Sequence, residues 1–500
     1  MKSDTYTEHG SNLSNCLSSR RELLCRSWNG IGTIALSGLL SQSTEAAGSQ
    51  ADSDARSSAA DSAIQQMHVR ARKAKHCIFL FMAGGVSQLD SFEYKPTLKR
   101  LAGQQMPLRA DLAGELQGKL NFPHQLIPSA FEFARHGESG RWISSLFPQI
   151  STIADDLAFI HGIKVDNNNH GPATLHINTG DQFPGSPSVG SWISYGLGSV
   201  NDNLPGYLVI QDPRGAPVNG AAVWGNGYLP ASYQGTLLRS SGTPILNLQH
   251  SQHLSRQHQR EELDLLNWMN RRHLSERADH SDLEARIEAY ELAFRMQAQA
   301  PELVELSGET RETHRMYGLE DPVTSGFGRQ CLLARRLVER GVRYTLLVHG
   351  VEIGRESWDD HGDVSGRMQQ HAAEVDRPVA ALLSDLKQRG LLDETLVVWA
   401  SEMGRTPFHP GPRSDKPGRD HNQYGLVMWM AGGDVKSGAT TGNTDEFGLR
   451  STETPIPLRD VHATILDLMG LDDQTLTSLH AGRFRRLTDI GGQSLSDIIS

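Results

Sequence analysis

The sequence of 500 residues predicts an α/β fold in which a doubly wound, mostly parallel sheet is sandwiched by helices. Short apolar runs recur along the chain, and each has the length and continuity of a strand buried on both faces. Helical patterns fall between several of these runs, and alternation of strand and helix is typical of a parallel sheet. With 38% hydrophobic residues, the chain can also bury a large core.

The first predicted strand, Ile78 to Met82, ends in Gly84-Gly85, where a buried strand would enter a loop. Five later runs have the same character: Leu157 to Ile160, Tyr207 to Ile210, Tyr344 to Val348, Leu396 to Trp399 and Leu426 to Met430. Because the carboxyl ends of parallel strands face one crevice, polar residues that follow these runs are expected to converge there.

The predicted helices are recognised by the spacing of their apolar residues and by the glycines that end them. They comprise a face formed by Leu283, Ile287, Tyr290 and Phe294, a segment from Leu332 to Leu337 that Gly341 would close, and a segment from Val375 to Leu386 that leads to Gly390. Between about residues 250 and 320 the sequence is helical and charged, without strand-like runs. This stretch predicts a helical insertion, which either packs on the core or acts as a lid.

The N-terminus carries the segment Ser19-Arg20-Arg21-Glu22-Leu23-Leu24, followed by a mildly apolar stretch. It resembles a twin-arginine export signal, which directs folded proteins across the bacterial inner membrane. We therefore expect residues 1–48 to be such a signal and the protein to be periplasmic or extracellular; a disordered basic tail is the alternative. Residues 49–69 have few large apolar side chains and predict a disordered spacer, which leaves 70–500 as the folded domain.

Composition excludes several classes of partner. The formal net charge of -10 gives no basic excess for a phosphate backbone, so nucleic acid is not an expected partner. No run of about 18 or more apolar residues occurs, and no membrane span is predicted. Of the four cysteines, Cys16 and Cys25 lie in the expected leader, and Cys77 and Cys331 are interpreted as buried small hydrophobes rather than a disulfide framework.

Acids and histidines lie just beyond several apolar runs, and this pattern predicts a metal site. The residues are Asp90, His170, Asp359, His361, Glu402, Asp420 and His421. Imidazole and carboxylate ligands suit zinc, manganese or iron, and a carboxylate-rich site suits magnesium or calcium, so the expected cofactor is a divalent metal ion. Structural alternatives stay open: Asp90 as a turn former, Glu402 as a carboxylate paired with Arg405, and Asp420 or His421 as the residue that orients the other.

His170 stands before Gly171-Pro172 at the expected start of a helix, where its ring can face the crevice. Its role is open between metal ligand, acid or base, and nucleophile. The segment resembles the nucleophile motif of sulfatases, because Pro172 and Thr179-Gly180 keep the spacing of that motif and His170 occupies the nucleophile's place.

Further segments extend this resemblance. Leu396 to Arg405 looks like the strand and Ser-Asp-His-Gly metal loop of the alkaline phosphatase and sulfatase superfamily, with Glu402 in place of Asp and Met403 in place of His. The other matching segments are Gly84 to Asp90, Ser357 to Asp363, Gly404 to Pro407, Gly418 to His421 and the helix signature Asp460 to Leu471. From about Arg20 to Ile499 the pattern resembles one exported family, the domain of unknown function 1501 (DUF1501).

The resemblance implies an α/β sandwich in which one or two divalent metals hold a phosphate or sulfate ester. We expect an exported, metal-dependent hydrolase of small or polymeric anionic esters; the alternative is a catalytically silent relative that binds an anionic ligand or a surface partner. The expected metal site contains Asp90, Asp359, His361, Glu402, Asp420 and His421, with His170 and Arg405 as catalytic residues, Arg405 pairing with the anionic group. Without Cys or Ser at position 170, formylglycine chemistry is not expected, and Thr174 and Ser191 are alternative oxygen nucleophiles.

Overall fold

The computed structural model describes residues 72–107, 124–239, 255–275, 281–351, 356–411 and 414–500. The chain divides into two units, Met1–Met67 and His68–Ser500. The expected export signal at 1–48, the spacer at 49–69 and the cysteines Cys16 and Cys25 lie outside the described residues.

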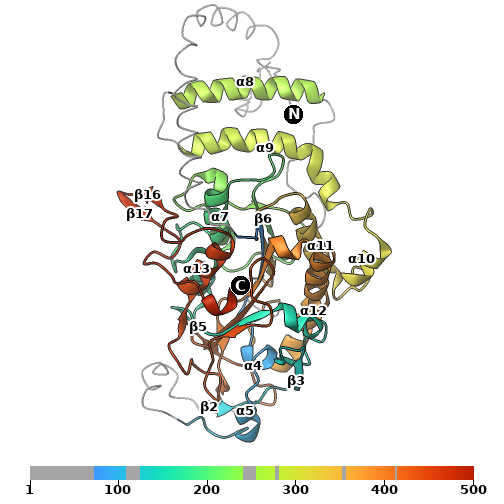
Figure 1. Cartoon of the computed structure of the whole chain (residues 1–500), viewed down its shortest axis with the longest axis vertical. Coiled ribbons are helices and arrows are strands. Elements are labelled where there is room, and N and C mark those ends of the chain that lie inside the picture. The colour runs from blue at the N-terminus through green and yellow to red at the C-terminus, as the bar shows by residue number, and fades with distance from the viewer. Residues whose placement is uncertain (1–71, 108–123, 240–254, 276–280, 352–355, 412–413) are drawn as a thin grey trace, which may run out of the picture. The chain divides into compact units, whose positions relative to one another are not determined.

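A central sheet forms the framework of the second unit (Figure 1). Strand β1 (His76–Met82) lies between β9 (Thr395–Ala400) and β8 (Tyr344–His349) and is parallel to both. Beyond β8 follow β6 (Tyr207–Ile210) and β7 (Thr236–Leu237), also parallel. Every one of the six predicted strands is observed, and the prediction of a mostly parallel sheet is confirmed.

The other half of the sheet contains its antiparallel strand. Beyond β9, β13 (Leu426–Ala431) runs antiparallel both to β9 and to the next strand, β5 (Ala158–Lys164). The short strands β14 (Thr440–Thr441) and β15 (Ile456–Pro457) pair in parallel with β5. Because β5 opposes β13, it points the same way as β1, β8 and β9.

Helices cover both faces of the sheet, as the alternation of side chains along β1 shows. Ile78, Leu80 and Met82 belong to a core that includes α11 (Ser325–Glu339) and α12 (Val364–Gln388). Cys77, Phe79 and Phe81 belong to a second core with α6 (His170–Thr179), α7 (Val189–Leu197) and α13 (Leu458–Leu468). The predicted helical sandwich is therefore confirmed, and Cys77 and Cys331 are both buried free thiols.

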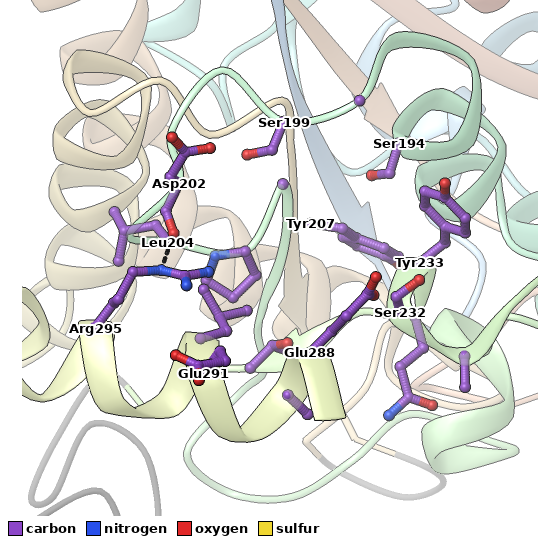
Figure 2. Close-up of a pocket in the computed structure, with 18 of the residues that line it drawn as sticks. Ser194, Ser199, Asp202, Leu204, Tyr207, Ser232, Tyr233, Glu288, Glu291 and Arg295 are labelled. Atoms are coloured by element: carbon purple, nitrogen blue, oxygen red, sulfur yellow. Dashed lines mark hydrogen bonds between the residues drawn. The ribbon is translucent and has the colours of Figure 1, made fainter. Parts of the chain in front are cut away.

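The stretch expected to be a helical insertion contains α8 (Arg256–Ser275), α9 (Ser281–Val304) and α10 (Arg311–Met316). Helix α9 contacts the body of the unit, where the Arg295 Nε donates to the carbonyl oxygen of Asp202 over 2.6 Å. A cavity of about 490 Å³ lies between α9 and the chain just before β6 (Figure 2).

The remaining elements are short. They are α4 (Gln88–Ser91), α5 (Pro96–Arg100), β2 (His124–Leu126), β3 (Phe133–His136), β4 (Arg141–Ser144), β10 (Gly404–Arg405), β11 (Phe408–Pro410), β12 (His421–Asn422), β16 (Ser478–His480), β17 (Arg483–Arg485) and single 3-10 turns at Ile150–Asp156, Gly220–Trp224, Ala231–Tyr233, Leu392–Glu394 and Ser496–Ile498. Among the described helices, none combines the length and apolar character needed to cross a membrane.

Candidate metal centre

Sheet topology brings four histidine and acidic segments to one edge. His170 follows β5, Asp359 and His361 follow β8, and Glu402 follows β9. His421 precedes β13, and because β13 is antiparallel, its beginning lies at the edge where β5, β8 and β9 end. The polar residues expected to converge at the ends of parallel strands are therefore joined by His421, which lies at the start of the antiparallel strand β13.

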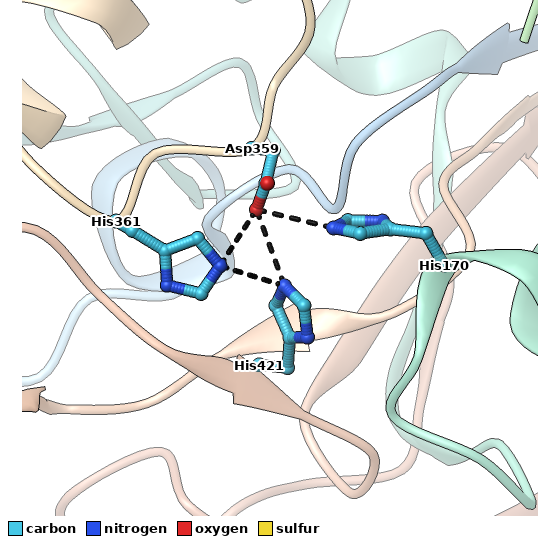
Figure 3. Close-up of side chains that lie close together, drawn as sticks. All are labelled: His170, Asp359, His361 and His421. Carbon is cyan, nitrogen blue, oxygen red and sulfur yellow. Dashed lines mark hydrogen bonds and ion pairs between the residues drawn. The ribbon is translucent and has the colours of Figure 1, made fainter. Parts of the chain in front are cut away.

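The carboxylate of Asp359 lies at the centre of three imidazoles (Figure 3). Its Oδ1 is 3.1 Å from Nε2 of His170, 2.9 Å from Nε2 of His361 and 3.2 Å from Nε2 of His421. The Nε2 atoms of His361 and His421 are themselves 2.9 Å apart. One ligand atom from each of the four residues thus lies within 4.8 Å of all the others.

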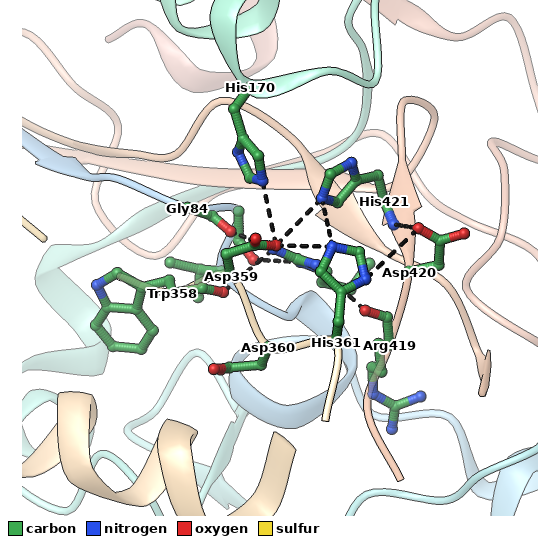
Figure 4. Close-up of polar contacts among 12 residues, drawn as sticks. Gly84, His170, Trp358, Asp359, Asp360, His361, Arg419, Asp420 and His421 are labelled. Atoms are coloured by element: carbon green, nitrogen blue, oxygen red, sulfur yellow. Dashed lines mark hydrogen bonds and ion pairs between the residues drawn. The ribbon is translucent and has the colours of Figure 1, made fainter. Parts of the chain in front are cut away.

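Two of the three imidazoles are oriented by a hydrogen bond at their second nitrogen. Nδ1 of His170 is 2.8 Å from Oε1 of Glu402, and Nδ1 of His421 is 2.6 Å from the carbonyl oxygen of Asn168. Nδ1 of His361 faces Oδ1 of Asp420 at 3.8 Å (Figure 4). The two hydrogen-bonded partners fix the rings of His170 and His421, and Nε2 of all three histidines faces the centre.

Glu402 is itself held by the turn that follows β1. Its carboxylate accepts from the amide of Gly84 at 2.8 and 3.0 Å and from the amide of Gly85 at 3.1 Å, and only 1% of the residue is exposed. Gly84 has a φ of 117°, and a Cβ there would lie 2.5 Å from the backbone nitrogen of Trp358. Only glycine fits this close approach, which places two amide donors on the buried carboxylate.

The electrostatics of the cluster follow from burial and close pairing. Burial alone would raise the pKa of Asp359, but the three close histidines and the charge of Arg405 hold that pKa well below its usual range. For His170, burial opposes the charged form, yet Asp359 and Glu402 together raise its pKa to about 9. The neighbouring Asp360 points away from the centre (Figure 4), and burial raises its pKa to about 7.

The donor set fits a divalent ion. Four ligands at about 2.0–2.2 Å from a tetrahedral zinc lie about 3.3–3.6 Å from one another, and four of the six separations here are 2.9–3.2 Å. A carbonyl oxygen only accepts, so Nδ1 of His421 carries the proton and its neutral Nε2 offers a lone pair. Nε2 of His170 is buried and has no well-aligned hydrogen bond within the chain. Three imidazoles and one carboxylate would hold the ion.

Two residues expected to be ligands act instead on the ligand side chains. Glu402 orients His170, and Asp420 faces His361 and accepts from the backbone amide of His421 at 2.8 Å. Neither belongs to the group of four convergent ligand atoms. This geometry does not match the expectation that both bind the metal, and it fits the alternative that Asp420 orients His421.

Asp90 and Arg405 also lie differently from their expected roles. Asp90 is buried in an ion pair with Arg419, with 2.6 Å between Oδ2 and Nε, and it is not in the ligand group. Arg405 is 1% exposed, and its guanidinium donates to Asp359 at 2.8 Å and to the carbonyl oxygen of Gly85 at 2.8 Å. A buried guanidinium with these partners cannot meet a substrate anion, so Arg405 positions Asp359.

A second group of possible ligands, His349, His371 and Glu374, lies behind the first. Nε1 of Trp358 donates to Nδ1 of His349 at 3.0 Å, and Nε2 of His349 is 2.7 Å from Glu374. The guanidinium of Arg214 is 3.1 Å from Glu374 and 3.4 Å from His349 Nε2. Because Arg214 already provides the cation, we interpret this group as a network that fixes Trp358 beside Asp359.

Several supports of the site have no signature in the sequence. The carbonyl of Asn168 and the amides of Gly84 and Gly85 act through the backbone, which every residue carries. Ser401 Oγ accepts from the amides of Gly85 and Val86, each at 3.0 Å. The Gly-Gly pair and the asparagine run before His170 stand out in the sequence, but nothing in it indicates that they contact Glu402 and His421.

Comparisons with solved structures find similar chains at low identity. A phosphonate monoester hydrolase from Silicibacter pomeroyi is 12% identical, with a TM-score of 0.35, over 84% of this chain and 76% of that one. A sulfatase from Pseudoalteromonas sp. is 12% identical, with a TM-score of 0.33, over 88% and 76%. A protein in the alkaline phosphatase superfamily from Vibrio parahaemolyticus is 9% identical, with a TM-score of 0.35, over 87% and 72%.

Similarity this low leaves the chemistry of the site to be argued from the chain's own residues. No curated protein matches the chain. The sequence model of one family, described as "Protein of unknown function (DUF1501)", matches residues 74–499. The match covers most of the chain and includes every residue of the metal centre, and the chain therefore belongs to the DUF1501 family.

Proposed function

We propose that this chain is a metal-dependent hydrolase of phosphate or sulfate esters. The observation that carries the proposal is the convergence of His170, His361 and His421 on Asp359, each imidazole presenting Nε2 to one point. Three of the segments that carry the family resemblance supply these residues: the one that begins at His170, Ser357 to Asp363, and Gly418 to His421. A divalent ion held there supplies Lewis-acid chemistry, polarising an ester oxygen and making water a better nucleophile at neutral pH.

The exposed side of the site indicates where a substrate enters. The side chain of His361 is 44% exposed, whereas those of His170, Asp359 and His421 are 14–15% exposed. A substrate would therefore approach past His361. Asp420 lies beside this entrance, with its Oδ1 3.8 Å from Nδ1 of His361.

The chain's own hydroxyl groups are poor candidates for the nucleophile. Ser191 is fully buried, and its Oγ bonds to Ser188 Oγ at 2.8 Å and to the carbonyl oxygen of Gly225 at 3.0 Å. Thr174 is 1% exposed within α6. His170 has both ring nitrogens directed at carboxylates, which suits a ligand better than a nucleophile. We therefore propose that water attacks the ester.

The competing proposal is a silent member that binds an anionic ligand or partner through the same crevice. It is favoured by Met403, which stands where the superfamily motif has a histidine ligand and is fully buried in the core. It is also favoured by Arg405, which is not available to an anion. The two proposals share the crevice and differ in whether the protein turns over an ester.

The deciding experiment measures metal and turnover on the same full-length protein. Metal content is determined by mass spectrometry after dialysis, followed by a panel of phosphate and sulfate esters. We expect about one divalent ion per chain, and we expect His361→Ala to lose both metal and turnover. His480→Ala, which removes an exposed histidine elsewhere, is the matched control. Bound metal without turnover on any ester would favour the silent binder, and absence of metal would refute the hydrolase.

Export through the twin-arginine pathway remains a proposal of its own. It rests on Arg20-Arg21 and the apolar stretch that follows them. Replacing both arginines by lysine should leave the protein in the cytoplasm of a bacterial host, as measured by cell fractionation. Unchanged export of the lysine variant would refute it.

A further inference from the structure

The outer face of α8 exposes a cluster of large apolar side chains. Leu265, Leu266, Trp268 and Met269 are 41%, 46%, 46% and 54% exposed and lie within five consecutive positions. Scattered apolar residues on a surface are ordinary, but a contiguous patch marks an interaction surface. Covering this apolar surface with a partner would remove it from water, which is favourable.

The opposite face of α8 is already occupied by α9 (Figure 1). Leu263 is 8% exposed, and Arg260 on the same side pairs with Glu291 of α9 at 2.6 Å. With 100° of rotation per residue, Leu265 and Met269 lie on the far side of the helix from Leu263. The exposed cluster is therefore separate from the contact that holds α8 to α9.

The side of α8 away from Leu263 has the spacing of a coiled-coil seam, and of its five residues only Glu262 is half-buried. His258, Glu262, Leu265, Met269 and Arg272 follow one another at intervals of four, three, four and three residues. This alternation keeps the side chains on one stripe of a helix and suits packing against a second helix.

When a second copy of this stripe runs in the opposite direction, its apolar residues face apolar residues and its acidic residue faces a basic one. Counting outward from Asn267, Leu265 and Met269 lie two positions away on either side, and Glu262 and Arg272 lie five positions away. In an antiparallel pair, Leu265 would face Met269 of the second copy and Glu262 would face Arg272 of the second copy. Neither Glu262 nor Arg272 forms an ion pair with another described residue of the chain, although the guanidinium of Arg272 lies 5.9 Å from the ring of Trp268.

We propose that two copies of this chain associate through the exposed faces of their α8 helices, packed antiparallel about a two-fold axis that lies level with Asn267, whose own side chain faces Glu291 of α9. An isologous contact of this kind uses the same patch on both copies, which the reversed symmetry of the stripe supplies. Its apolar centre would cover Leu265, Leu266, Trp268 and Met269, and its two ends would each hold one Glu262–Arg272 pair. The contact leaves the metal centre, at the carboxyl edge of the sheet, untouched.

The test is a pair of charge reversals in the full chain, followed by sedimentation equilibrium. The wild type should sediment with twice the mass of one chain. Glu262→Arg alone places two arginines opposite each other at both ends, and Arg272→Glu alone does the same with glutamates. Each change should weaken self-association about tenfold or more. Arg and Glu have similar helix propensity, so α8 itself is preserved.

An equimolar mixture of the two variants gives the sharpest outcome. In a mixed dimer every arginine at these positions again faces a glutamate, so association should return to the wild-type level. Glu453→Arg, the same charge change on an exposed loop, is the control and should remain dimeric. A monomeric wild type, single variants that dimerise as well as the wild type, or a mixture that stays monomeric would each overturn the proposal.

Discussion

Replacing Glu402 by glutamine tests the support of the metal centre with a change of one atom. Oε1 of Glu402 faces Nδ1 of His170 at 2.8 Å, while Oε2 accepts from the amide of Gly85 at 3.1 Å and from Ser401 Oγ at 3.1 Å. The NH2 group of the glutamine would have to face either Nδ1 of His170 or the amide of Gly85 and Ser401 Oγ, all of which already act as donors. Leaving a buried donor without an acceptor costs about 1–3 kcal/mol, and losing an outer partner of a ligating histidine costs about 10–100-fold in metal affinity.

Two measurements on the same variant check this prediction. Urea unfolding of the metal-free protein should show a free energy of unfolding lower by about 2 kcal/mol, and competition with a chelator should show weaker metal binding. Glu394→Gln is the matched control: its carboxylate pairs with Lys75 at 2.5 Å but is 46% exposed, so a change below about 0.5 kcal/mol is expected. Wild-type stability together with wild-type metal affinity in Glu402→Gln would refute the anchoring role.

Three other changes test different parts of the molecule. Gly84→Ala should lower the free energy of unfolding by about 2 kcal/mol or more, because its Cβ would lie 2.5 Å from the nitrogen of Trp358 at a φ of 117°; an unchanged urea midpoint would contradict this. Asp90→Ala should cost about 3 kcal/mol or more by leaving Arg419 buried without its partner, while folded protein keeps its metal; metal loss at unchanged stability would make Asp90 a ligand. Burial raises the pKa of Asp376 to about 6, above its value of about 3.9 in an unfolded chain, so protonation favours the folded state. That stabilisation is complete below about pH 3.9 and is lost as the pH rises through 6, so between pH 5 and 7 the wild type should lose about 1 kcal/mol relative to Asp376→Asn, and equal pH profiles would refute it.

The ligands of the candidate site were readable because each follows or precedes a strand. His170, Asp359, His361 and His421 all stand next to runs whose strand character is local in the sequence. Asp90 shares that position, yet its partner Arg419 is 329 residues away, and no local pattern records such a pairing. A residue type at a strand end thus predicts proximity to the crevice but not the direction in which its side chain points.

Glu402 and Arg405 also show that position at a strand end does not determine what a side chain contacts. Their residue types suit a ligand and an anion receptor, and both lie at the correct edge of the sheet. Burial decides otherwise: each is 1% exposed and is surrounded by backbone donors or acceptors of the β1 turn. Only the packing of that turn against the end of β9 determines that one orients His170 and the other holds Asp359.

The sequence by itself determined the α/β sandwich, its six main strands and the edge at which the polar residues gather, because strand character and connection order are local properties. The tertiary structure alone decided which four side chains share one point, since that depends on the antiparallel course of β13 and on contacts across hundreds of residues. It also decided that the stripe on α8 is exposed, because α9 covers the opposite face of the helix. The periodicity of apolar residues can be read from the sequence, whereas the burial of a side chain depends on how the whole chain packs.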